Sequence, residues 1–199
     1  MIAAQKMNFQ GVPLDIKSIA FDMAEGCLTE IKEIFFIEGK YPPVLRWCSY
    51  AQPDWPKPHQ ILSEYWRERT YVDEFSIEEI MEGSLTRRIV PYLAKVSRIG
   101  TDDNFKYDFI GERAAFFMGV PQTYDQNLIS ILEKTQSAQD LFNLTSISAC
   151  GIRGQGMLVL SQDGTDADPI LWNKMILPLT NRSGQVDEFV ISILRMPPR

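Results

Sequence analysis

Residues 176–194 read Ile176-Leu-Pro-Leu-Thr-Asn-Arg-Ser-Gly-Gln-Val-Asp-Glu-Phe-Val-Ile-Ser-Ile-Leu194 and decide the fold. Two apolar runs rich in β-forming residues flank four turn formers, Asn181 to Gly184, which predicts an antiparallel hairpin. In the second run Phe189, Ile191 and Ile193 alternate with other apolar residues, so both faces of this strand are apolar. A sheet of this kind has to be covered on both sides.

Three further strands are expected before this hairpin. A short strand at residues 95–99 is followed by residues 105–109, which alternate strictly between aromatic and charged side chains. Residues 157–161 form the third, and a polar loop at 162–169 leads from it into the hairpin's first strand at 171–179. The alternation predicts that three aromatic side chains share one face of the second strand: Phe105, Tyr107 and Phe109.

Helical segments lie before and between these strands. An amphipathic helix is expected from His59 to about Thr70, a short acidic helix at 76–81 and another around 85–93 that Pro91 kinks or ends. Between the second and third strands, three helical segments are expected, the last with Gly151 as its C-terminal cap. Their predicted ranges are 112–118, 127–134 and 138–149.

The first 56 residues differ from the rest. Residues 15–38 favour one or two amphipathic helices broken near Gly26, with a strand at 31–37 as the alternative. Residues 52–58 hold three prolines and form a stiff linker. We therefore expect residues 1–56 to be a helical extension with a Pro-rich linker, and residues 57–199 to be the main domain.

Composition limits the class of protein. The 199 residues are 45% hydrophobic and 23% charged, as in a globular chain, and no apolar run has the roughly 20 residues of a membrane helix. The N-terminus lacks a signal-peptide pattern, and three widely spaced cysteines fit a reducing compartment, so a soluble cytoplasmic protein without disulfides is expected. A net charge of −6 disfavours nucleic acid as a partner.

The order of elements, two strands, a helical crossing and three antiparallel strands, resembles a PAS domain over about residues 60–195. The resemblance is carried by Ile61-Leu-Ser-Glu-Tyr-Trp-Arg67, Arg88-Ile-Val-Pro-Tyr-Leu93, Phe105-Lys-Tyr-Asp-Phe-Ile-Gly111 and Ile176-Leu-Pro-Leu-Thr180. More closely, the chain resembles the short PAS-like proteins common in alphaproteobacteria. The resemblance implies an α+β fold with a five-stranded antiparallel sheet and N-terminal helices. It also implies a signalling role by contact in trans, as a homodimer, with a partner such as a histidine kinase.

A PAS sheet curves around a pocket, which here holds either a small apolar ligand or only packed side chains. The packed core is the more usual arrangement for aromatic and Met residues. If a ligand is bound, the expected contacts are Phe105, Tyr107, Phe109, Phe116, Phe117, Cys150, Met175 and Leu177.

The other face of the sheet is the expected partner or dimer surface. This face also has to be covered, and the entry helix is a candidate for the cover, either from the same subunit or from a neighbouring one. The residues expected at this surface are Ile61, Tyr65, Trp66, Trp172 and Ile176.

Catalysis is not expected, nor is a metal or other cofactor. His59 is the sole histidine and lies at the start of the entry helix, before the predicted core. The alternatives are an enzyme with the cone-shaped fold of ketosteroid isomerase, which would need a buried Asp opposite a Tyr or His, and a ligand-free structural adaptor.

Overall fold

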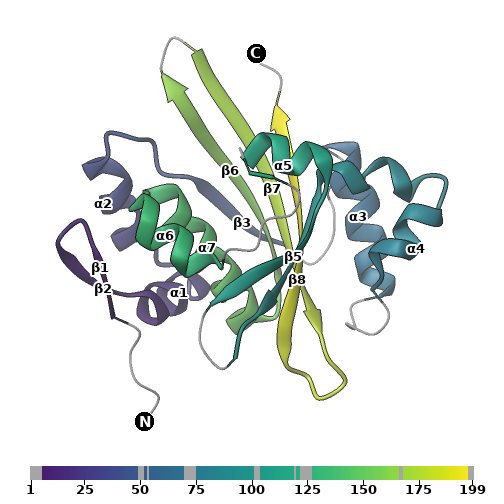
Figure 1. The fold of residues 1–199 in the computed structure, drawn as a ribbon, viewed down its shortest axis with the longest axis horizontal. Coiled ribbons are helices and arrows are strands. Elements are labelled where there is room, and N and C mark those ends of the chain that lie inside the picture. Colours follow the sequence, from purple (N-terminus) through teal and green to yellow (C-terminus); the bar gives the residue numbers. More distant parts are fainter. Residues whose placement is uncertain are drawn as a thin grey trace.

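A six-stranded antiparallel sheet with helices on both faces forms the centre of the molecule (Figure 1). The computed structural model describes residues 6–48, 52, 54–69, 75–100, 104–118, 120–121, 127–165 and 168–196. The strands of the sheet are β3 (Val44–Cys48), β4 (Leu93–Arg98), β5 (Phe105–Ile110), β6 (Gly156–Thr165), β7 (Asp168–Thr180) and β8 (Val186–Met196).

The hairpin predicted at residues 176–194 is confirmed as β7 and β8, which pair with Ile176 opposite Ile191. Its turn is closed by Asn181, whose Oδ1 accepts hydrogen bonds from the backbone N–H groups of Ser183 at 3.0 Å and Gln185 at 2.9 Å. Gly184 follows with φ of 86°, a conformation that glycine adopts without strain. The turn makes β7 and β8 neighbours, and pairing with β6 on one side and β4 on the other makes them the central strands of the order β3-β6-β7-β8-β4-β5.

Helices cover the two faces of the sheet separately, as the apolarity of both faces requires. The first face carries α1 (Ile16–Ala24), α2 (Thr29–Ile37), α5 (Glu112–Met118), α6 (Leu128–Thr135) and α7 (Ala138–Arg153). The second face carries α3 (Lys57–Glu68), α4 (Ile77–Glu82) and the 3₁₀ turns η2 (Thr86–Arg88) and η3 (Val90–Tyr92). In Figure 1, α1, α2, α6 and α7 lie on one side of the twisted sheet and α3 and α4 on the other.

The N-terminal residues share the core of the first face. The helices α1 and α2 are separated near Gly26, as predicted, and residues 31–37 are helical, so the strand alternative was wrong. A small hairpin of β1 (Lys6–Phe9) and β2 (Val12–Asp15) precedes them. Asp15 caps α1 through its carboxylate, which accepts from the N–H groups of Lys17 and Ser18. Residues 44–48 form β3, which pairs with β6 and adds one strand to the five that were predicted. The division of the chain into two domains at residue 57 stays a prediction.

Three predicted boundaries were wrong. The helix α7 continues past Gly151 and ends at Gly154, whose φ of 63° is the left-handed cap conformation. Residues 162–165 and 168–169 of the predicted loop are strand, because β6 and β7 stay paired as far as Thr165 opposite Asp168; residues 166–167 lie outside the described residues. Main-chain pairing does not require apolar side chains. Around Pro91 there are two 3₁₀ turns where a helix was expected, since proline lacks the N–H that helix continuation needs.

A β-bulge in β5 also changes the predicted face of Phe109. Lys95 pairs with Phe109 but the next residue, Val96, pairs with Tyr107, so Asp108 is an extra residue on β5. Phe105 and Tyr107 therefore contact the first face, as alternation predicts, whereas Phe109 packs against the core of the second face. The fold class is nonetheless the predicted one: α+β, PAS-like, with two strands, a helical crossing and three strands in one antiparallel sheet.

Candidate functional site

The residues predicted to line one pocket lie on two different faces. Phe105 and Cys150 are fully buried between the sheet and α7, whereas Met175 and Leu177 are buried on the second face under α3 and α4. Phe116 is 72% exposed on α5. The prediction placed residues of different faces together. Alternation along one strand shows which of its own side chains share a face, but not which side chains of a neighbouring strand lie on that same face.

Aromatic side chains fill the space between the first face and α7. The rings of Phe105 and Phe189 meet edge to face with centroids 5.5 Å apart, and Phe142 packs against Phe35 from α2 in the same way at 6.1 Å. All four rings are at most 1% exposed. These contacts favour the packed core over a ligand cavity at this position.

Cys150 belongs to this packing. The side chain is completely buried, and burial raises the pKa of its thiol well above the usual value. Cys48, half-buried at the end of β3, has a pKa raised to about 11, again because burial disfavours the thiolate. Both thiols therefore act as small apolar groups and not as nucleophiles.

The predicted partner surface is largely occupied by the chain itself. The indole N–H of Trp66 donates to the backbone carbonyl of Pro178 at 2.7 Å, and Trp66 is only 8% exposed. Ile176 is 4% exposed on the first face, and Trp172 packs there against Phe117 with centroids 5.5 Å apart. The second cover of the sheet thus comes from α3 and α4 of the same subunit.

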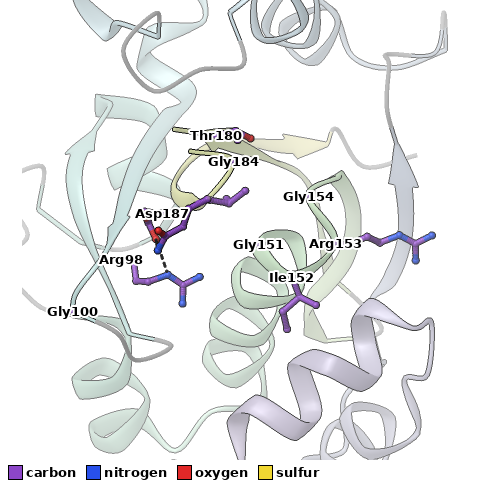
Figure 2. A pocket seen from close by; sticks show the side chains of 11 residues that line it. Arg98, Gly100, Gly151, Ile152, Arg153, Gly154, Thr180, Gly184 and Asp187 are labelled. Atoms are coloured by element: carbon purple, nitrogen blue, oxygen red, sulfur yellow. Dashed lines mark hydrogen bonds and ion pairs between the residues drawn. The ribbon is translucent and has the colours of Figure 1, made fainter. Parts of the chain in front are cut away.

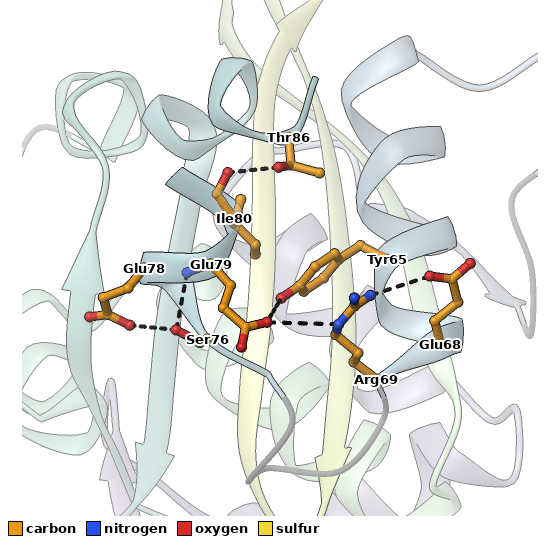
Figure 3. Close-up of polar contacts among 8 residues, drawn as sticks. All are labelled: Tyr65, Glu68, Arg69, Ser76, Glu78, Glu79, Ile80 and Thr86. Carbon is orange, nitrogen blue, oxygen red and sulfur yellow. Dashed lines mark hydrogen bonds and ion pairs between the residues drawn. The ribbon is translucent and has the colours of Figure 1, made fainter. Parts of the chain in front are cut away.

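Polar contacts hold α4 against α3 (Figure 3). The hydroxyl of Tyr65 donates to Glu79 Oε2 at 3.1 Å, and the guanidinium of Arg69 lies 4.6 Å from the centre of the Tyr65 ring and 3.8 Å from the same carboxylate. Ser76 caps α4 by accepting from the N–H of Glu79 at 3.2 Å. Tyr65 and Ile61, both half-buried, are thus packed against the second-face core.

A groove of about 820 Å³ lies where α3 leaves the second face uncovered, beside the N-terminus of that helix. Its floor is made by parts of β3, β6, β7 and β8. The ends of β6, β7 and β8 extend past the helices in Figure 1. We call it the sheet-end groove. It is lined by Val44, Leu45, Arg46, Asp54, Trp55, Pro56, Pro58, Tyr92, Phe117, Leu158, Leu160, Asn173, Leu194, Arg195 and Met196.

Most of this lining is apolar, and part of it is accessible to solvent. Val44 is 66% exposed and Leu160 45%, while Trp55 is buried in the groove wall. Strand pairing aligns Val44, Leu160, Asn173 and Leu194 in one row across four strands. An apolar depression of this size with few polar groups has the character of a small-molecule site.

Asn173 is the polar group in the floor of the groove, and a hydrogen bond to a buried histidine of α3 fixes its orientation. The Nε2–H of His59 donates to Asn173 Oδ1 at 2.9 Å, and both side chains are buried. The other ring nitrogen, Nδ1, is buried without a hydrogen-bond partner, and burial lowers the pKa of His59 to about 4. His59 is therefore neutral near pH 7 and acts as a donor that orients the Asn173 amide.

A second hollow, of about 590 Å³, lies at the C-terminal end of α7 (Figure 2). Arg98 reaches into it and pairs with Asp187 at 3.4 Å, while its guanidinium also lies 5.1 Å from the centre of the Phe105 ring. Arg153 points away, donates to the carbonyl of Ala24 at 2.7 Å and stacks over Trp47. With its arginines engaged and a helix C-terminus beside it, this hollow does not suit an anion.

The sequence carried one signal for the groove that the predicted site did not use. Asn173 and Lys174 interrupt an apolar run on β7, and Asn173 is the one of the two that is buried, where a polar side chain needs a hydrogen-bond partner. Its partner His59 lies 114 residues away. The pairing therefore became evident only in the folded chain.

Comparisons with known proteins do not identify a family for this chain. No family model matches the chain, and no curated protein matches it. Among solved structures, it is similar to an RNA-binding light-oxygen-voltage receptor with 12% sequence identity and a TM-score of 0.40. The match covers 82% of this chain and 42% of the receptor chain, so the chain spans less than half of that receptor's length. A likeness this loose carries no inference about function. The class defined by the structure itself is an α+β, PAS-like domain with an open groove at the end of its sheet.

No helix in the described part of the chain is long and apolar enough to cross a bilayer. Within the same residues, no group of three or more His, Cys, Asp or Glu side chains is placed to hold a metal ion.

Proposed function

We propose that the chain is a PAS-like sensory module that binds a small apolar molecule in the sheet-end groove and signals in trans to a protein partner. The observation that carries this proposal is the groove itself, whose volume of about 820 Å³ lies in the range of small-molecule sites. The proposed ligand site lies on the face opposite to Phe105, Tyr107 and Cys150, the residues first expected to contact a ligand.

The groove also offers a route for a signal. Asn173 lies in its floor and is bonded to His59, which belongs to α3, and α3 is joined to α4 through Tyr65 and Glu79. A ligand that binds more tightly to one arrangement of Asn173 and α3 than to another would shift the equilibrium between these arrangements. The shift is limited by the difference in binding free energy. The surface of α3 and α4 is therefore where we propose that a partner, such as a histidine kinase, reads the state of the domain.

A homodimer, a cytoplasmic location and the absence of a nucleic-acid partner remain parts of this proposal. The net charge of −6 supports the last of these, because phosphate contacts require clustered basic side chains. The residues first expected at a dimer surface are poor candidates, since Trp66 and Ile176 are buried within the chain. The more specific likeness to short PAS-like proteins of alphaproteobacteria also stays a prediction.

Two other functions are weaker candidates. An enzyme of the ketosteroid-isomerase type needs a buried Asp opposite a Tyr or His, and the buried polar side chains among the described residues include no carboxylate. A ligand-free adaptor would use the same surfaces, with the groove contacting only a partner. The adaptor differs from the sensor in one measurable respect, because it retains no small molecule.

Native mass spectra of the freshly purified chain, compared with denatured spectra, test the proposal. The expected result is an added mass that is lost on denaturation, retained by the wild type and by Leu85→Asp but not by Leu160→Asp. Both leucines are exposed, Leu85 at 65% and Leu160 at 45%, but only Leu160 lines the groove, so the pair separates a groove effect from the cost of a surface charge. Retention by Leu160→Asp would place the ligand elsewhere, and no added mass would leave the adaptor. The same spectra give the subunit number.

A further inference from the structure

The charges of the sheet-end groove differ in sign from those of the chain as a whole. Two arginines and one aspartate line it, Arg46, Arg195 and Asp54, in a protein of net charge −6. Among the described residues, neither arginine forms an ion pair with a carboxylate. An unpaired guanidinium beside an apolar floor is suited to an anionic group carried on an apolar body.

Strand register places one of these arginines on the floor. Arg46 on β3 pairs with Leu158 on β6, and Leu158 packs into the core of the second face, so Arg46 lies on the groove side of β3. Arg195 pairs with Trp172, which belongs to the first face, so Arg195 contacts the groove only from its rim. Arg46 is therefore the cation that a molecule lying on the floor would meet.

We propose that the sheet-end groove binds an amphipathic carboxylate of medium chain length, with its head group between Arg46 and Asn173. This proposal rests on the function proposed above and specifies the class of ligand. On β6, Leu160 pairs with Asn173 of β7 and with Val44 of β3, and Arg46 is the next residue of β3 on the same face, diagonal to Leu160. A carboxylate over Leu160 therefore has Asn173 directly beside it and the long side chain of Arg46 within reach from the other side. Because Asn173 Oδ1 already accepts from His59, its amide NH₂ is the group left to donate to a carboxylate oxygen.

The hydrocarbon tail extends from β6 across β7 to β8. Two strand spacings cover roughly 10 Å, which suits a medium-length chain. Leu194 and Met196 on β8 provide the apolar floor at that end, and Trp55 provides a wall. Each methylene buried there strengthens binding, because apolar surface is removed from water.

Three probes of nearly equal tail length separate the contribution of the head group from that of the tail: decanoate, decanol and decyltrimethylammonium. Each is titrated calorimetrically into the full chain below its micellar concentration. Decanoate is expected to bind about tenfold more tightly than decanol, the effect of a charge-assisted hydrogen bond replacing a neutral one, and the ammonium more weakly than either.

Charge variants test the residue assignment. Arg46→Gln is expected to weaken decanoate binding about tenfold and to leave decanol unchanged. Asp54→Asn removes the one carboxylate of the lining and is expected to strengthen decanoate binding. Arg87→Gln is the matched control, because Arg87 is an exposed arginine outside the groove, and it should change neither affinity.

The outcomes distinguish this proposal from the one on which it rests. Equal affinities for decanoate and decanol, or decanoate binding unaffected by Arg46→Gln, would overturn the head-group assignment while leaving an apolar ligand in the groove. If no probe binds and Leu160→Asp retains the same added mass as the wild type, both proposals fail. Binding of all three probes that also survives Leu160→Asp would show partitioning onto other apolar surfaces and would overturn the head-group assignment as well.

Discussion

The imidazole of His59 and the carboxamide of Asn173 form a buried hydrogen bond of 2.9 Å between the first turn of α3 and the middle of β7. The bond fixes the start of α3 over the sheet and, at the same time, orients the polar group in the floor of the sheet-end groove. Helix position and groove chemistry are therefore joined through one pair of side chains, and this pair gives the first prediction.

Acid should destabilise the protein through His59. Its pKa is about 4 in the folded chain against 6.5 for the exposed group, so the unfolded chain binds a proton more readily. The stability that comes from keeping His59 neutral is fully present above pH 6.5, declines as the pH falls and is lost by about pH 4. The free energy of unfolding decreases by about 3 kcal/mol in total over this range. Urea denaturation at pH 7 and pH 5 should show a decrease in the free energy of unfolding of about 2 kcal/mol from this residue.

His59→Gln provides the control, since His59 is the only histidine and Gln cannot titrate. The variant starts from a lower stability at pH 7 but should lose about 2 kcal/mol less than the wild type on going to pH 5. Parallel pH profiles for the two proteins would contradict the assignment.

Trp66→Phe should destabilise the protein by about 1–2 kcal/mol, because it removes the indole N–H that donates to the carbonyl of Pro178 while retaining an aromatic ring in the second-face core. The midpoint of urea denaturation measures the loss. Phe116→Leu, at a ring that is 72% exposed on α5, is the comparison and should change stability by less than about 0.5 kcal/mol. Equal effects would mean that the indole bond contributes nothing.

Tyr65→Phe should have a smaller effect, about 0.5 kcal/mol, since the bond from its hydroxyl to Glu79 is exposed to solvent. Its ring, which meets Phe75 edge to face at 5.3 Å, is retained. Hydrogen exchange should increase in α4 more than in α3, because α4 is the short helix that this contact secures. Unchanged exchange in α4 would show that apolar packing alone holds it.

Gly154→Ala should destabilise the protein by about 1 kcal/mol through the backbone alone. Gly154 has φ of 63° and an added Cβ would meet no atom within 4 Å, so the cost is conformational. Gly154→Asn should recover part of the loss, because asparagine tolerates this conformation better than alanine. Thermal unfolding of the two variants tests the order, and a less stable asparagine variant would contradict it.

Element types were predictable where local chemistry decides them. The β7–β8 hairpin follows from Asn181 and Gly184 between apolar runs, and the break between α1 and α2 follows from Gly26. The relative placement of side chains on the sheet was not predictable to the same degree. Phe109 changed face because of one extra residue in β5, and Met175 was assigned to the wrong face because no local signal aligns β7 with β5.

The sequence by itself determined that this chain forms an antiparallel sheet with apolar residues on both faces and a helical crossing, because side-chain alternation and turn formers act over a few residues. Only the tertiary structure decided which helices cover which face, that residues 44–48 form the sixth strand, and that Arg46, Asn173 and Leu194 lie around one groove. These relations join residues up to 148 positions apart, from Arg46 to Leu194, and they depend on strand register and on how far α3 extends over the sheet. Both are set by the packing of the whole core, which no local pattern specifies.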